Sequence, residues 1–188
     1  MKKILLVIFL TPFYAAFSFA AAAGDASQNP GLIPLGMLAS FGVHEAGHHL
    51  VGTVSGKIRW REGLWVYYGN ENELKLVAIS GFRFQSVGSE LLLETMPTDN
   101  LFLVGYIGFN IINNILYVAK MESTKYQKEG GNDFLVFKNK NHRRIVEIAV
   151  LARAISLAYR LFNANAFRGW IDVDLDEGVP TLKLLFSF

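Results

Sequence analysis

The segment from Phe41 to Gly52 reads FGVHEAGHHLVG and lies within a long apolar run. His44, Glu45 and His48 follow the order H-E-x-x-H. On an α-helix the two histidines lie on one face a turn apart, so both imidazoles can bind one metal ion. Glu45 lies beside them and can reach a metal-bound water without binding the metal, which is the arrangement for metal-assisted hydrolysis. The segment therefore predicts a zinc site on a helix, with Glu45 as the general base.

The amino-acid composition excludes several other kinds of site and partner. The chain has 188 residues, no cysteine and a net charge of +2. Without cysteine there is no disulfide framework, no thiolate metal site and no cysteine nucleophile, so a metal must be held by His, Asp or Glu. The small net charge and the scattered basic residues argue against a nucleic-acid partner. Charged residues make up 18% of the chain, below the roughly 25% of an ordinary soluble domain, which favours a membrane setting.

The N-terminal residues 1–23 have the features of an export signal. Lys2 and Lys3 precede the apolar run ILLVIFL, and small residues follow it. This order predicts either a cleaved signal peptide or an uncleaved membrane anchor. Residues 24–188 are then expected to form a single metallopeptidase-like domain.

The rest of the chain predicts a mainly α fold, a small helical bundle that carries the H-E-x-x-H helix, with an inserted β-hairpin and a C-terminal strand pair. Helices are expected over residues 31–54, 81–94, 99–120 and 145–162. The β-branched and aromatic stretches IRWREGLWVYYG and NELKLVAIS flank residues 69–72 and predict the hairpin, with a polar turn between them. The C-terminal strands are expected on either side of a turn at Gly178 and Pro180.

The helix around the motif is long enough to span a bilayer, and Glu45 is its only formally charged residue. Ionisable groups are costly in that setting and usually mark a functional site. Lys57, Arg59 and Arg61 follow the helix directly, which would place that end in the cytoplasm. We therefore expect a cell-envelope protein in contact with membrane lipid at the inner membrane, with the periplasm and the outer membrane as alternatives.

Glycines and a third histidine flank the motif. Gly42 and Gly47 leave the backbone near the histidines without side chains, which would permit close packing of another element. His49 lies one position off the face of His44 and His48, and we expect it beside the site or at the surface.

Polar residues also interrupt the two later helices. Asn110 and Asn113 are three residues apart and can face one partner, and interhelical hydrogen bonding would explain them without a functional role. Arg153 and Arg160 lie in an apolar pattern, so we expect that helix to lie at an interface or to extend its arginines towards polar surroundings.

A zinc hydrolase site has three protein ligands and one open position for water, so the motif leaves one ligand to be found. The candidates are Glu90, Glu94, Asp133 and His142. Glu90 lies in the next expected helix, where glutamate zincins place their third ligand. Asp133 lies in a glycine-bracketed break between helices. The residues alone leave this choice open.

In the order of its elements the chain resembles the site-2 protease family of intramembrane zinc proteases. The resemblance is carried by HEAGHHLV inside an apolar helix, a following hairpin, FNIINNIL and GGND. It implies His44, His48 and Asp133 as zinc ligands and Glu45 as general base. The expected activity is that of a membrane-associated metalloprotease, a zinc-dependent hydrolase that cleaves a peptide or membrane-protein substrate.

The same resemblance puts Asn110 or Asn113 in the position of a substrate-positioning asparagine. Two other interpretations of the sequence stay open. One is a soluble or peripheral exported zincin that uses Glu90 as its third ligand. The other is a non-catalytic envelope protein in which the histidines are structural.

Overall fold

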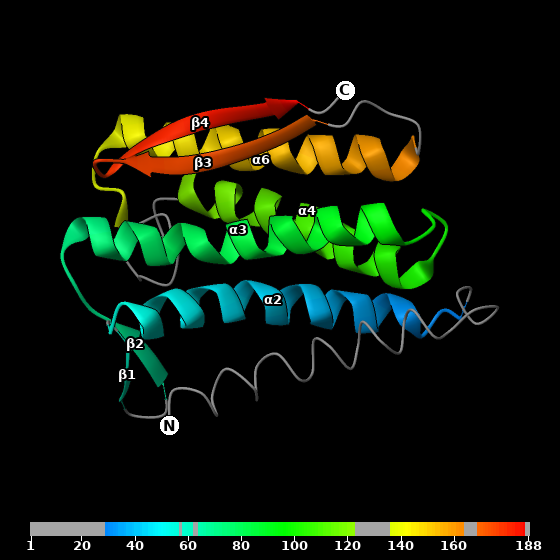
Figure 1. Ribbon diagram of the computed structural model, residues 1–188, viewed down its shortest axis with the longest axis horizontal. Helices are drawn as coiled ribbons and strands as arrows, with labels where there is room; N and C mark the ends of the chain where they lie inside the picture. Colours follow the sequence, from blue (N-terminus) through cyan, green and yellow to red (C-terminus); the bar gives the residue numbers. More distant parts are fainter. Residues whose placement is uncertain (1–28, 57, 62–63, 123–135, 164–168, 187–188) are drawn as a thin grey trace.

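The computed structural model describes residues 29–56, 58–61, 64–122, 136–163 and 169–186. Within these ranges the protein has four helices and two antiparallel strand pairs, so the expected mainly α fold is confirmed. Figure 1 shows the four helices running alongside one another as a bundle, with one strand pair near the end of the first helix and the other along the last. The residues expected to form an export signal, 1–23, lie outside the described ranges.

Helix α2 (Leu32–Val54) carries the H-E-x-x-H motif and packs at backbone distance against two other helices. A Cβ atom at Gly36 would lie 2.7 Å from the backbone nitrogen of Tyr106 in α4 (Leu101–Glu122). A Cβ atom at Gly47 would lie 2.6 Å from the carbonyl oxygen of Ser80 in α3 (Glu71–Thr95). The expected close packing is confirmed at Gly47, whereas a Cβ at Gly42 would have nothing within 4 Å.

Helix α3 starts where the sequence analysis expected a turn and a strand, and that expectation was wrong. The Asn70 side chain accepts a hydrogen bond from the Glu73 N–H at 3.0 Å, and the Glu73 carboxylate accepts one from the Asn70 N–H at 2.8 Å. This capping box begins the helix at Glu71, because it satisfies backbone donors that have no intrahelical partner. The stretch NELKLVAIS is therefore helical. The hairpin lies wholly within IRWREGLWVYYG, as β1 (Ile58–Arg61) and β2 (Leu64–Tyr67).

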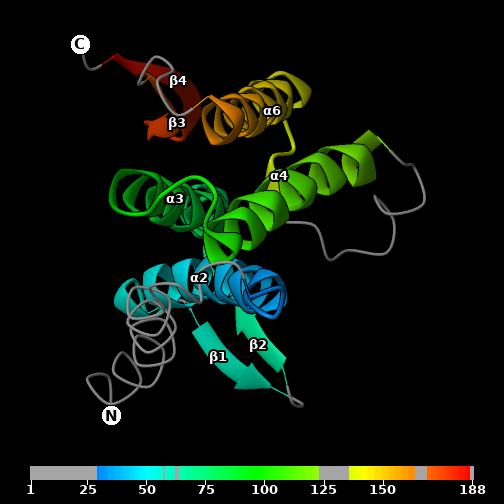
Figure 2. The same cartoon turned by 90° about the vertical axis from the view of Figure 1, so that its right-hand side faces the viewer.

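Helices α4 and α6 (Lys140–Phe162) complete the bundle, as Figure 2 shows. Helix α6 begins at Lys140 rather than at residue 145, because the Asn139 side chain accepts hydrogen bonds from the first N–H groups of the helix. Two apolar clusters fill the bundle. One includes Phe82 and Phe137 and joins α3 to α6, and the other includes Phe102 and Tyr106 and draws on all four helices.

The C-terminal strand pair, β3 (Gly169–Asp176) and β4 (Val179–Phe186), is confirmed. Its two turn residues, Glu177 at φ 49° and Gly178 at φ 82°, both adopt the left-handed conformation that a tight hairpin turn requires. Lys75 donates to the Gly178 carbonyl at 3.4 Å, and Arg83 lies 3.5 Å from the Asp174 carboxylate. The hairpin is thereby attached to α3 as well as to α6.

One helix in the described part of the chain, Leu101–Lys120 of α4, is long and apolar enough to cross a membrane. This length and composition support membrane association, without identifying the membrane. Helix α2, which the sequence analysis expected to span, does not meet the same criterion, since its histidines and Glu45 lower its average hydropathy. That α2 spans stays a prediction.

Candidate metal site

His44 and His48 lie on the buried face of α2 and are only 1% and 5% exposed. Their Nε2 atoms face each other at 3.0 Å. Two histidine nitrogens on one tetrahedral zinc ion lie about 3.3 Å apart, because each Zn–N bond is about 2.0–2.1 Å long. The pair therefore has nearly the spacing of two ligands of one ion, and the two rings share a face as the motif predicted.

A backbone carbonyl of α3 fixes which nitrogen of His48 carries its proton. His48 Nδ1 lies 2.7 Å from the Val77 carbonyl oxygen, which can only accept, so we assign the proton to Nδ1. Nε2 of the neutral ring then directs a lone pair towards His44. Metal-binding histidines characteristically donate their second N–H to a carbonyl or carboxylate, which sets tautomer and ring orientation. Helix α3 thus sets the orientation of the His48 ring and the direction of its Nε2 atom.

The His48 ring fits against α3 because residue 81 is glycine. A Cβ atom at Gly81 would meet Nε2, Cε1 and Cδ2 of the His48 ring. The neighbouring Ser80 hydroxyl donates to the same Val77 carbonyl at 2.5 Å, so this carbonyl is held between a side chain of its own helix and His48. The sequence analysis did not single out Gly81 for the site. The available signal was a glycine within a helix. Glycine lowers helix stability, so its presence there usually has a packing or functional reason.

Aromatic rings from three elements surround the histidine pair. The Phe82 ring contacts His44 edge-on with centroids 4.7 Å apart, and the Tyr117 ring of α4 lies 5.7 Å from the same ring. Tyr67 of β2 lies 6.4 Å from the His48 ring. Such a shell lowers the local dielectric constant, and this strengthens electrostatic interactions at a bound ion. These rings carry no separate signal in the amino-acid sequence, since aromatic residues are common in apolar cores.

Glu45 is half-buried at the border of the site. It lies one turn after Phe41, which is 49% exposed, so Glu45 is between the buried face of the histidines and an outer face of α2. This position suits a base that approaches a metal-bound water from outside the ligand pair. His49 is only 6% exposed, so of its two expected positions the surface one was wrong.

The described ranges contain no group of three His, Cys, Asp or Glu side chains that could hold a metal ion. His142 lies in the first turn of α6, where its backbone N–H is 3.4 Å from the Asn139 side chain, and it does not complete such a group. Asp133 lies outside the described residues and stays a prediction.

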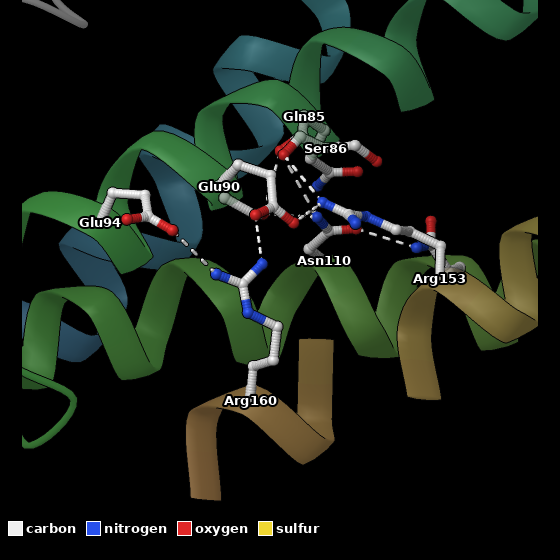
Figure 3. A network of polar contacts seen from close by, with 9 residues as sticks. Gln85, Ser86, Glu90, Glu94, Asn110, Arg153 and Arg160 are labelled. Atoms are coloured by element: carbon white, nitrogen blue, oxygen red, sulfur yellow. Dashed lines mark hydrogen bonds and ion pairs between the residues drawn. The ribbon is translucent and has the colours of Figure 1, made fainter. Parts of the chain in front are cut away.

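Glu90 and Glu94 belong instead to an ion-pair network between α3 and α6, shown in Figure 3. Glu90 forms salt bridges with both Arg153 and Arg160, and Arg160 also contacts Glu94 at 3.2 Å. Both arginines are buried and paired with α3 inside the bundle, so the expected extension towards polar surroundings at the surface was wrong. Because Glu90 is held by two arginines, the interpretation as an exported zincin that uses Glu90 finds no support in this arrangement.

Asn110 takes part in hydrogen bonds between helices. Its Nδ2 donates to the Ser89 hydroxyl of α3 at 2.7 Å, and Asn114 Nδ2 donates to Asn110 Oδ1 at 2.9 Å. The expected interhelical role is confirmed for Asn110. Its neighbour on the buried face is Asn114, one turn along, whereas Asn113 is half-buried.

Comparison with known proteins assigns no family to this geometry. No protein-family model matches the chain, and no curated protein or solved structure matches it either. The resemblance to site-2 proteases therefore rests on the H-E-x-x-H motif and the order of the elements.

Proposed function

We propose that this protein is a membrane-associated, zinc-dependent peptidase. The observation that carries the proposal is the arrangement of the histidine pair on α2. The two Nε2 atoms lie 3.0 Å apart, and the Val77 carbonyl accepts a hydrogen bond from His48 Nδ1 at 2.7 Å. A preset tautomer and a nearly correct ligand spacing together favour metal binding over chance burial of two histidines.

The proposed chemistry is hydrolysis of a peptide bond. A zinc ion bound by the pair would lower the pKa of a bound water to about 7 and polarise the substrate carbonyl. In this proposal Glu45 would accept a proton from the attacking water and return it to the leaving amine. His48 keeps its orientation throughout, because its Nδ1–H stays bonded to the Val77 carbonyl.

The remaining parts of the proposal rest on the resemblance and the composition. Asp133 is the proposed third ligand. The substrate is a peptide or a membrane protein, and the protein contacts membrane lipid, at the inner membrane. The α4 segment Leu101–Lys120, long and apolar enough to span, supports the membrane setting.

The test is the variant Glu45→Gln, which removes the base and keeps the size of the side chain. We expect turnover of a labelled casein probe in detergent to fall about 10²- to 10⁴-fold while bound zinc is retained. Glu94→Gln is the matched control, because it makes the same change at a carboxylate that contacts Arg160 rather than the histidines. Equal cleavage by Glu45→Gln and the wild-type protein would show that Glu45 is not the base.

A structural role for the histidines is the second candidate, because the same 3.0 Å spacing also fits a hydrogen bond between neutral rings. In that case His44 Nε2 donates to the lone pair of His48 Nε2. The two functions differ in metal content, since a structural hydrogen bond needs no zinc.

A further inference from the structure

Besides its apolar core, the bundle buries many polar side chains and leaves many large apolar side chains exposed. Among the described residues, 17 large hydrophobic side chains are exposed and 15 polar or charged side chains are buried. The buried set includes two arginines and all three histidines of the motif helix. Soluble domains seldom bury so many groups of this kind, whereas membrane proteins turn them towards the bundle interior. The apolar outer faces therefore need an apolar environment.

Seven of these 17 exposed apolar side chains lie on α2 and α4, which pack against each other. We define the α2–α4 face as the exposed Leu38, Phe41, Ile112, Ile115 and Leu116 together with the half-buried Phe109. The Phe41 and Phe109 rings contact each other edge-on, with centroids 6.2 Å apart, and so join the two helices into one surface. Leu38 is 68% exposed and Ile112 is 52% exposed, so both side chains are open to solvent or to an apolar partner.

Helices α2 and α4 pack in the way that helices pair inside membranes. A Cβ atom at Gly105 would lie 2.8 Å from the Cα of Ile33, and the contact of Gly36 with α4 is equally close. The buried Gln85 side chain donates to the Ser40 hydroxyl at 2.8 Å, which links α3 to α2. In lipid the hydrophobic effect does not favour helix association, so close packing at glycines and interhelical hydrogen bonds stabilise it instead.

Charges mark the two ends of this surface. In Figure 1 the ends of α2 and α4 and the start of α6 lie at one end of the bundle. The basic residues at that end include Arg59, Lys120, Lys138, Lys140 and Arg144. The turn from α3 to α4 at the opposite end carries Asp99 and no lysine or arginine, although the basic end also carries the acidic residues Glu71, Glu73 and Glu177. This asymmetry follows the positive-inside rule and suits the anionic headgroups of a cytoplasmic leaflet.

We infer that the α2–α4 face contacts lipid acyl chains, with α2 and α4 crossing the membrane as a parallel pair whose C-terminal ends face the cytoplasm. The 20-residue span of α4 is about 30 Å long, which matches the hydrocarbon thickness of a bilayer. Only 39% of that span is buried inside the fold, which leaves most of it for lipid. Helix α2 looks too polar by composition because its histidines count in the average, although they point into the bundle.

This inference rests on the membrane association in the proposed function, but on neither zinc nor turnover. It can be tested with spin labels, because the chain contains no cysteine and each single-cysteine variant carries one label. The full chain is reconstituted in phosphatidylcholine–phosphatidylglycerol vesicles. Collisions of the label with oxygen, which dissolves in lipid, are compared with collisions with a water-soluble nickel complex. Labels on the face are Leu38→Cys, Ile112→Cys and Leu116→Cys.

Labels at Asn72→Cys and Thr95→Cys serve as controls, because both residues are exposed at the ends of α3. We expect oxygen collisions to dominate at the three face positions and nickel collisions to dominate at both controls. Nickel access at the face equal to that at Asn72 would place the face in water and overturn the inference. Low collision rates with both reagents would show a protein cover, such as a second copy, and would also overturn it. A protein released by carbonate washing refutes membrane association itself, whereas a failed cleavage assay leaves the labels unaffected.

Discussion

Two buried polar clusters contact the same helix, α3, and they are built on different principles. Near its start, Val77 and Gly81 hold the His48 ring through one hydrogen bond and one glycine. Further along, Glu90 pairs with Arg153 and Arg160 of α6. The network balances opposite charges within itself, with Glu94 as the second carboxylate. The histidine pair instead brings two nitrogen atoms together, and among the described residues it is not part of a group of three metal-binding side chains.

Under the proposed function, the ion-pair network is complete as structure, whereas the histidine pair would bind a metal ion. A charge-balanced network needs no further group. Removal of one of its members leaves an uncompensated buried charge. Two imidazoles, one of them with its tautomer fixed by a hydrogen bond, would be stabilised by a cation between them. Mutations in the ion-pair network should therefore act mainly on stability, whereas mutations at the histidine pair should act mainly on metal binding.

The largest stability effect is expected from Glu90→Ala, because it leaves Arg153 and Arg160 buried without their shared partner. We expect the free energy of unfolding to fall by about 3–5 kcal/mol, measured by urea titration in detergent. The folded fraction should bind as much zinc as the wild-type protein. Glu94→Ala is the control, since that side chain is 42% exposed and its loss should cost no more than about 1 kcal/mol. Loss of zinc without loss of stability in Glu90→Ala would mean that the network belongs to the metal site.

Gly81→Ala should lower stability less than Glu90→Ala does, and should also weaken zinc binding. The new Cβ would meet the His48 ring and displace it, so zinc affinity should fall about 10- to 100-fold. The overpacking should cost about 1–3 kcal/mol of stability. Gly42→Ala is the matched control on the motif helix, because nothing lies within 4 Å of its Cβ position. Zinc titrations that give equal affinities for the two variants would show that Gly81 does not set the position of His48.

The sequence predicted most of the fold but misjudged the start of α3. Helices α2 and α4 and the C-terminal strand pair were found because their periodicity and turn residues are strong. The stretch after Asn70 was assigned to a strand on its β-branched residues. The capping box of Asn70 and Glu73 was already present in the sequence and would have indicated a helix.

The site was only partly predictable for a different reason. The motif identified His44 and His48, because helical spacing alone brings them together. The Val77 carbonyl is a backbone group, so its role cannot be read from the identity of a side chain. The space at Gly81 depends on how α3 crosses α2. Glu90 was a reasonable third ligand until the positions of Arg153 and Arg160 were known, since ion pairing between distant helices is decided by tertiary packing.

The most direct measurement of the central claim is the zinc content of the folded chain. The protein should be purified in zinc-containing buffer without chelators and compared with His44→Ala, His48→Ala, Asp133→Ala and Glu45→Gln by elemental analysis. We predict about one zinc ion per chain in the wild-type protein and in Glu45→Gln, and loss of zinc in both histidine variants and in Asp133→Ala. A folded wild-type chain without zinc, and histidine variants that fold and behave like it, would contradict the metal site and leave the histidines a structural role.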